Sequence, residues 1–206
     1  MSMLNHEFKT PMSTITMTLG SNGIPDGPRR RIARAVSAMS ALIDRCLQSD
    51  QLAYGTVEVT KTRCDILSLL EDTRRACSEP ERVNIEAGNT PTMRADTQLV
   101  SVILGNLIDN ALKYSPPGSP VDVRMGRIVE NGMGGTRIAV SNLVSTAGMP
   151  DPNQVFNKYY RAPGAHGKVG SGLGLHISAG FAARMGGWLR YLPSPKRVQF
   201  ELWIPN

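Results

Sequence analysis

Residues 106–114 read Asn-Leu-Ile-Asp-Asn-Ala-Leu-Lys-Tyr, and this stretch decides how the rest of the chain is interpreted. It lies in a long helix predicted after Asp96, whose apolar side carries Leu99, Ile103, Leu107 and Ala111. Asn106, Asn110 and Lys113 are spaced i, i+4 and i+7, so they line the opposite face. Amide oxygens suit a Mg²⁺ ion already bound to phosphate, and lysine offers phosphate a point charge. The stretch predicts a phosphate site, although a solvated helix face fits the spacing equally well.

A second phosphate-binding signal lies at residues 170–175, Gly-Ser-Gly-Leu-Gly-Leu, where the helix predicted over 173–185 begins. Glycines let the backbone approach a ligand closely, and amide groups at a helix N-terminus favour phosphate. A flexible hinge is the plain alternative. The dinucleotide-binding βαβ fingerprint is excluded, because no predicted strand runs directly into this loop. Residues 143–172 are rich in Gly, Pro, Ser and Asn, and so long a loop is usually functional or disordered.

The N-terminal part of the chain predicts a helical hairpin. Apolar residues step by three or four over residues 4–19 and again over 32–47. A cluster of glycine and proline at 20–28 makes the turn between the helices. Two helices alone cannot enclose a core, so pairing with a second copy into a four-helix bundle would bury both apolar stripes.

The first predicted helix carries a candidate nucleophile. His6 and Thr10 are i and i+4, so they share one helical face, and Glu7 stands beside the histidine. An imidazole is a competent nucleophile when a carboxylate holds one ring nitrogen protonated and the other nitrogen is free. A surface His–Glu pair without a function is the plain alternative.

The remainder of the chain predicts an α+β sandwich. Apolar residues alternate at Val57 and Val59 and over 83–87, as in strands, and further strand-like runs cover 121–127, 137–141, 188–192 and 198–204. Asp65 is placed to cap a helix that runs to about residue 77. These patterns divide the chain into a hairpin over 1–53 and a second domain over 54–206.

Four stretches resemble the H-, N-, F- and G2-boxes of sensor histidine kinases of two-component systems, and they occur in the family's order. They are Asn-His-Glu-Phe-Lys-Thr-Pro at 5–11, the stretch at 106–114, Val-Phe-Asn-Lys-Tyr-Tyr-Arg at 155–161, and the glycine-rich loop at 170–175. With the closing strands the resemblance covers essentially the whole chain. It implies a dimerisation and phosphotransfer hairpin, half of a dimeric four-helix bundle, followed by a gyrase-type ATP-binding domain with a mixed sheet.

The resemblance also implies an activity. His6 would take phosphate from ATP, with Glu7 orienting the ring, and pass it to an aspartate on the receiver domain of a response regulator. Thr10 would help to orient a water for dephosphorylation of that regulator. The implied cofactors are ATP and Mg²⁺, with Asn110 as the metal ligand. The residues implied to bind the nucleotide are Asn106, Asn110, Lys113, Tyr114, Asn142, Gly148, Arg161, Gly170, Gly172, Leu173 and Gly174.

One motif departs from the family. Its G1 box is usually Asp-x-Gly-x-Gly, and the aspartate accepts a hydrogen bond from the exocyclic amine of adenine. Residues 140–150 contain no aspartate. Aligning Gly148 with the second glycine puts Val144 at the aspartate position, where a valine cannot accept a hydrogen bond. We prefer Asn142, whose amide oxygen can; the loss of charge would weaken the bond by about 1 kcal/mol.

The composition narrows the classes of function. The 206 residues are 41% hydrophobic and 19% charged, which is ordinary for a globular protein. A net charge of +6 favours anionic partners, but aromatics make up only 5%, which argues against a single-strand nucleic-acid platform. Three cysteines without a CxxC motif fit a reducing compartment. No apolar run approaches the roughly 20 residues that span a bilayer.

Some alternatives stay open at this stage. A pseudokinase, acting as a scaffold or phosphatase with impaired ATP binding, fits the degenerate G1 box, and a basic nucleic-acid-binding module fits the charge. Residues 29–31, all arginine, form either a solvated basic turn or a docking surface for an acidic partner. His166 and His176 form no metal set with His6. The chain begins five residues before His6, so we expect a fragment or a truncated gene, cytoplasmic or the cytoplasmic part of a membrane-anchored sensor.

Overall fold

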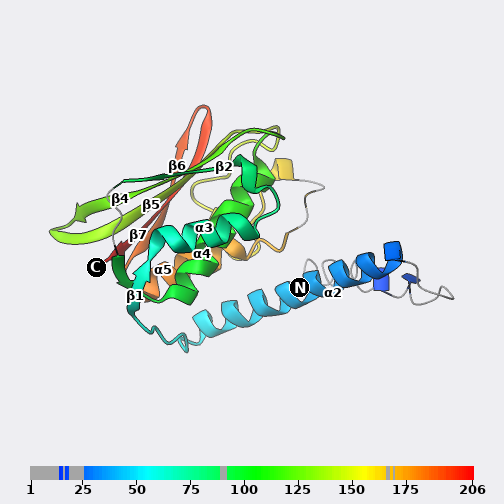
Figure 1. The fold of residues 1–206 in the computed structure, drawn as a ribbon, viewed down its shortest axis with the longest axis horizontal. Helices are drawn as coiled ribbons and strands as arrows, with labels where there is room; N and C mark the ends of the chain where they lie inside the picture. The colour runs from blue at the N-terminus through cyan, green and yellow to red at the C-terminus, as the bar shows by residue number, and fades with distance from the viewer. Residues whose placement is uncertain (1–13, 16, 19–25, 89–91, 166–167, 169) are drawn as a thin grey trace.

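A five-stranded mixed sheet forms the centre of the protein in a computed structural model that describes residues 14–15, 17–18, 26–88, 92–165, 168 and 170–206. The strand order is β2-β4-β5-β7-β6; β2 and β4 are parallel and the other neighbours are antiparallel (Figure 1). The strands are β2 (Val83–Ala87), β4 (Val121–Glu130), β5 (Met133–Leu143), β6 (Trp188–Ser194) and β7 (Arg197–Pro205). The predicted α+β class with a mixed sheet is confirmed.

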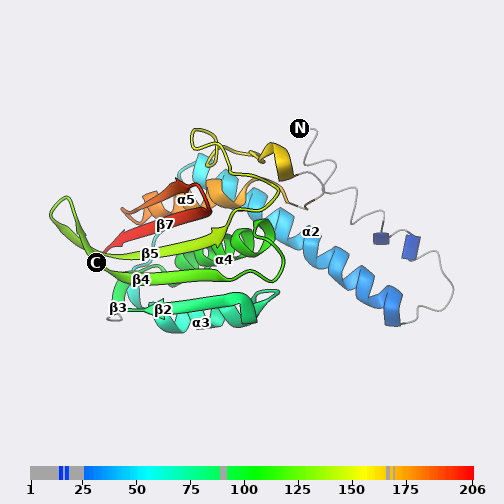
Figure 2. The same ribbon diagram turned by 90° about the horizontal axis from the view of Figure 1, so that it is seen from above.

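Three helices pack on one face of this sheet (Figure 2): α3 (Ile66–Ala76), α4 (Thr97–Tyr114) and α5 (Gly174–Arg184). Two begin where the sequence predicted, because an aspartate caps each. Asp65 accepts hydrogen bonds from the amides of Leu67 and Ser68, and Asp96 accepts them from the amides of Gln98 and Leu99. Two short 3₁₀ helices, η1 (Pro80–Arg82) and η2 (Pro163–Ala165), lie in the connections.

The two faces of the sheet have opposite character. The side chains that meet the helices are apolar, and α4 buries Ile103, Leu104, Leu107 and Ile108 completely or nearly so. The other face carries charged side chains that pair across strands: Arg124 with Glu86, Arg137 with Glu201, Arg190 with Glu130 and Arg197 with Asp122. Period-two alternation along each strand separates the core side from the charged side.

Helix α2 (Asp26–Ala53) extends away from the sheet, and its C-terminal end contacts α5 (Figure 1). Leu52 packs on α5 at Gly180, where an added Cβ would lie 2.6 Å from the leucine Cδ1. Just beyond the helix, Arg184 donates a hydrogen bond of 2.6 Å to the Val57 carbonyl. None of the described helices is long and apolar enough for a membrane span.

The structure describes only part of the helical hairpin that is predicted at the N-terminus. Helix α2 agrees with the second predicted helix, and residues 14–15 and 17–18 are helical. The remainder of the first predicted helix lies outside the described residues, so the hairpin and its division from the second domain at residue 53 stay predictions.

One predicted strand is wrong. Val57 and Val59 alternate with polar neighbours, but residues 56–61 form no strand. Their polar backbone is satisfied by side chains instead, since the Thr60 amide donates to Asp96 Oδ2 at 2.8 Å. The strand comes later, as β1 (Thr62–Asp65), and pairs with β3 (Thr92–Ala95) in a small antiparallel sheet.

A buried arginine joins η1 to the end of α4. Arg82 is only 7% exposed. Its guanidinium donates to the Ser119 carbonyl at 2.8 Å, to Glu79 Oε2 at 2.8 Å, to Ser115 Oγ at 2.5 Å and to the Pro116 carbonyl at 3.2 Å. A cation at the C-terminal end of a helix also interacts favourably with the helix dipole. Arg82 therefore fixes the last turn of α4.

We expect Arg82→Met to lower the free energy of unfolding by about 2 kcal/mol or more, because buried acceptors lose a charged donor. Urea denaturation followed by circular dichroism measures this. Arg124→Met is the matched control: Arg124 also pairs with a glutamate, but its side chain is 68% exposed, so a much smaller loss is expected. Equal losses in the two variants would contradict the role given to Arg82.

Candidate nucleotide-binding site

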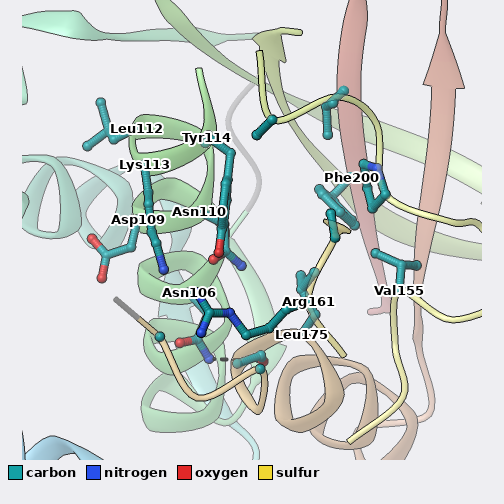
Figure 3. Close-up of a pocket in the computed structure, with 18 of the residues that line it drawn as sticks. Asn106, Asp109, Asn110, Leu112, Lys113, Tyr114, Val155, Arg161, Leu175 and Phe200 are labelled. Atoms are coloured by element: carbon teal, nitrogen blue, oxygen red, sulfur yellow. Dashed lines mark hydrogen bonds between the residues drawn. The ribbon is translucent and has the colours of Figure 1, made fainter. Parts of the chain in front are cut away.

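A cavity of about 470 Å³ lies between α4, the start of α5 and the ends of β5 and β7 (Figure 3). Helix α4 supplies one wall, with Asn106, Asp109, Asn110, Lys113 and Tyr114. The connection between β5 and α5 supplies the facing wall, with Gly148, Val155, Tyr160, Arg161, Gly170 and Gly172. The sheet contributes Asn142, Val198 and Phe200. One end of the cavity is thus polar and the other is lined by apolar and aromatic side chains.

The polar face of α4 carries two asparagines with different surroundings, Asn106 and Asn110. The Asn106 amide donates to the Gly174 carbonyl at 3.3 Å and to Ser178 Oγ at 3.2 Å, so it ties α4 to α5. An added Cβ at Gly174 would lie 3.2 Å from Asn106 Oδ1, so the two helices approach closely here. Asn110, one turn later, is half-buried and makes no hydrogen bond with the described residues. Its amide is the one on this face that a ligand can use.

Positive charge gathers at the end of α4. Lys113 Nζ lies 4.8 Å from the centre of the Tyr114 ring, and Lys168 Nζ lies 5.5 Å from it. Lys168 also donates a hydrogen bond to the Lys113 carbonyl. Because two ammonium groups lie close to the same tyrosine ring, the end of the cavity beside the last turn of α4 is suitable for binding phosphate. No motif in the sequence pointed to Lys168.

The glycine-rich loop passes close to both walls of the cavity. Gly172 has a φ of 70°, and an added Cβ there would lie 2.6 Å from the Tyr159 carbonyl carbon. The Tyr159 amide donates to the Gly172 carbonyl at 3.0 Å. At Gly170 an added Cβ would lie 2.5 Å from Lys113 Nζ. At Gly172 the close atoms belong to the backbone, so only glycine fits there without displacing the loop, whereas at Gly170 the flexible end of Lys113 can move aside.

The loop leads into α5 at Gly174, whose first turn has no side-chain cap. Its amide groups are therefore not occupied by a capping side chain, as a phosphate-binding helix start requires. Leu173 does not line the cavity: its side chain is fully buried in the core. The other predicted nucleotide-binding residues all line it.

Arg161 faces α4 across the cavity (Figure 3). Its guanidinium donates to the Ala165 carbonyl at 3.2 Å and to the Lys168 carbonyl. These bonds hold the connection between β5 and α5 in place. Contact between Arg161 and phosphate stays a prediction. His176, which the sequence analysis left without a role, lies 3.1 Å from the Phe156 carbonyl through Nδ1 and joins α5 to the same connection.

Asn142 and Val144, the two residues considered for the position of the missing aspartate, have different surroundings. Asn142 is buried at the end of β5 and lines the cavity. Val144 is outside the lining; it packs against the core, and its amide donates to the Lys196 carbonyl at 3.0 Å. Gly148 also lines the cavity, in a turn closed by a 3.0 Å bond from its amide to the Ser145 carbonyl, with a φ of 73°.

Three charged lining residues were not predicted: Arg45, Glu79 and Asp109. Arg45 comes from α2 and faces Asp109 of α4. Partial desolvation raises the pKa of the Asp109 carboxyl, and the charges of Arg45 and Lys113 oppose that rise. Arg45 and Glu79 come from segments far from 106–114 in sequence, and only tertiary packing brings them to the site. The candidate nucleophile His6, with Glu7 and Thr10, lies outside the described residues.

Comparison with known proteins agrees with this geometry. Residues 95–206, which carry α4, α5 and four of the five strands of the central sheet, match the family described as histidine kinase-, DNA gyrase B-, and HSP90-like ATPase. The chain belongs to this ATPase family. The sequence-based resemblance to sensor histidine kinases with a gyrase-type ATP-binding domain is therefore confirmed.

Two of the relatives that the chain resembles are named as sensor proteins. The chain is 28% identical to the sensor protein KdpD of Mycobacterium tuberculosis, over 95% of this chain and 24% of KdpD. It is 25% identical to the sensor protein kinase PmrB of Pseudomonas aeruginosa, over 84% of this chain and 37% of PmrB. The chain thus spans about a quarter to just over a third of these proteins.

The fold also matches a solved structure along nearly its whole length. The histidine kinase AdeS of Acinetobacter baumannii superposes with a TM-score of 0.73 and covers 97% of both chains at 16% sequence identity. At this sequence identity the likeness concerns the fold alone.

We expect Gly172→Ala to weaken nucleotide binding by about tenfold or more, because its Cβ would collide with the backbone of Tyr159 and shift the loop. Titration calorimetry with Mg·ADP measures the dissociation constant. Gly55→Ala is the matched control, since Gly55 has a φ of 69° but open space around it. That variant should lose about 1 kcal/mol of stability and bind ADP normally. Unchanged affinity in Gly172→Ala would contradict the close approach described.

Proposed function

We propose that this chain is the catalytic part of a sensor histidine kinase, which transfers the γ-phosphate of ATP to His6. The observation that carries the proposal is the convergence of Asn110, Lys113 and the uncapped start of α5 on one cavity. In this proposal residues 1–53 form the dimerisation and phosphotransfer hairpin and residues 54–206 the ATP-binding domain. The family match and the named relatives support it.

The lining residues fit a magnesium nucleotide. Asn110 presents an amide without a hydrogen bond to any described residue, and its oxygen is a ligand of the type that Mg²⁺ accepts. When bound, the metal would neutralise charge that develops on the phosphates. Lys113 and the first amides of α5 would hold phosphate oxygens, and Tyr114 would lie beside the nucleotide.

The reaction is an in-line phosphoryl transfer. A ring nitrogen of His6 forms a bond to the γ-phosphorus while the bond from that phosphorus to the bridging oxygen breaks, and ADP leaves with that oxygen. Glu7 accepts a hydrogen bond from the other ring nitrogen, which orients the imidazole, and takes up the proton that the ring loses. Positioning supplies most of the rate acceleration in such transfers.

The proposed partners follow from the same assignment. Phosphate on His6 would pass to an aspartate of a response regulator receiver domain. A second copy of the chain would cover the apolar residues that α2 exposes, Val36, Ile43 and Leu47, which are 47%, 47% and 56% exposed. Such a stripe on an extended helix is typical of one half of a four-helix bundle.

The nucleophile is tested with γ-labelled ATP and Mg²⁺. We expect an acid-labile, base-stable phosphoprotein in the unaltered chain and no label in His6→Gln. His176→Gln is the control: it should keep the label, because His176 contacts the Phe156 carbonyl and does not line the cavity. Label that survives in His6→Gln would overturn the assignment of the nucleophile.

A phosphatase activity is proposed for Thr10, one helical turn after His6. Its hydroxyl both donates and accepts, so it can hold a water in line with a phospho-aspartate. We expect Thr10→Ala to keep autophosphorylation but to slow the release of phosphate from purified phospho-regulator. Equal release by both forms of the protein would remove Thr10 from this role and leave the kinase proposal intact.

A pseudokinase is the second candidate, favoured by Asn142 where the family usually has an aspartate. Titration with Mg·ATP separates the two candidates. Saturable binding together with labelling of His6 supports the kinase, and weak or absent binding without labelling supports the pseudokinase.

A further inference from the structure

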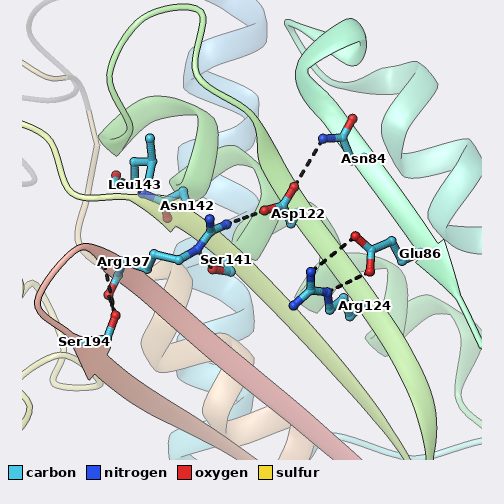
Figure 4. Close-up of polar contacts among 9 residues, drawn as sticks. All are labelled: Asn84, Glu86, Asp122, Arg124, Ser141, Asn142, Leu143, Ser194 and Arg197. Carbon is cyan, nitrogen blue, oxygen red and sulfur yellow. Dashed lines mark hydrogen bonds and ion pairs between the residues drawn. The ribbon is translucent and has the colours of Figure 1, made fainter.

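An arginine of helix α2 reaches the nucleotide cavity. Arg45 is half-buried and lines the cavity close to Asp109 of α4. The arginines on the outer face of the sheet are paired with carboxylates, as Arg124 is with Glu86 (Figure 4). Arg45, by contrast, forms no hydrogen bond or ion pair with any residue that the structure describes, although its charge opposes the rise in the pKa of the Asp109 carboxyl that desolvation causes. The N–H donors of its guanidinium are therefore available to a ligand.

Packing of α2 on α5 holds Arg45 at the cavity. Leu52 follows Arg45 by about two turns of helix, so the two side chains share one side of α2. Leu52 packs on α5 at Gly180, where an added Cβ would lie 2.6 Å from the leucine Cδ1. The exposed apolar residues Ile43 and Leu47 lie on the opposite side of α2. Pairing with a second copy through that opposite side therefore leaves Arg45 at the cavity.

The lining of the cavity indicates the direction in which a bound nucleotide extends. The apolar end, with Phe200 and Val198, suits the base, and Asp109 lies on the side of α4 away from Phe200 (Figure 3). With its base at the apolar end, a nucleotide extends its phosphates past Lys113 toward Asp109 and Arg45. Each added phosphate brings negative charge closer to Arg45, and a guanidinium binds phosphate oxygens through two parallel N–H donors.

Resting on the proposed function, we propose that Arg45 recognises the terminal phosphate of ATP. Asp109 offers Arg45 a single negative charge, whereas a terminal phosphate offers about two, together with three acceptor oxygens. Because Arg45 belongs to α2, this contact ties the proposed phosphotransfer hairpin to the triphosphate. ADP lacks the γ-phosphate, so the contact ends once that phosphate has been transferred.

Calorimetry with Mg²⁺ and two ligands tests the proposal without phosphoryl transfer: ADP and the β,γ-imido analogue of ATP. Arg45→Gln should weaken binding of the ATP analogue by about tenfold and binding of ADP by no more than about twofold. Arg45→Lys keeps the charge without the planar fork, so it should lose less affinity for the analogue than Arg45→Gln. Arg34→Gln is the matched control: it removes one charge from the same side of α2, about three turns earlier, and should bind both ligands as the unaltered chain does.

Each outcome decides between explanations. If Arg45→Gln weakens both ligands by one common factor, or weakens neither, Arg45 does not recognise the terminal phosphate and the proposal is overturned. If Arg34→Gln weakens the ATP analogue as much as Arg45→Gln does, the effect comes from overall charge and the proposal is again overturned. In both cases the kinase function stands, provided that His6 is labelled by ATP. If neither ligand binds to the unaltered chain, the proposed function fails, and the role of Arg45 fails with it.

Discussion

The bond from the Asn106 amide to the start of α5 is the interaction on which the site depends. The apolar side chains of α4 are almost completely buried against the sheet. The polar side of the helix therefore faces α5. The bonds to Gly174 and Ser178 connect the two helices beside the cavity. The same bonds set the distance between Asn110 and the glycine-rich loop.

Much of the fold follows from local signals. Asp65 and Asp96 are capping residues whose side chains satisfy the first amides of α3 and α4, so both helix starts could be predicted to the residue. The hairpin between β4 and β5 was predicted too short. Asn131 and Gly132, with φ of 51° and 80°, form its tight turn, and that Asn-Gly pair was a usable signal for longer strands.

The remaining differences have non-local causes. Residues 56–61 have the alternation of a strand, but their backbone finds side-chain partners in Asp96 and Arg184 in place of a neighbouring strand. In the site, helix periodicity placed Asn110 and Lys113 correctly on the cavity side. It could not reveal that Leu173 turns into the core, nor that Arg45 and Glu79 arrive from distant segments, because those positions depend on how the elements pack together.

The charged pairs on the outer face of the sheet have a consequence for how anions approach the protein. Four arginines there are matched by four carboxylates, so that face contributes no net charge. The chain as a whole carries +6. The excess of positive charge therefore lies outside these four pairs, and on the helical side Lys113 and Arg161 line the cavity while Lys168 lies close to Tyr114. Such a field is directional: it draws a polyphosphate toward the cavity mouth, and its reach shortens as the ionic strength rises.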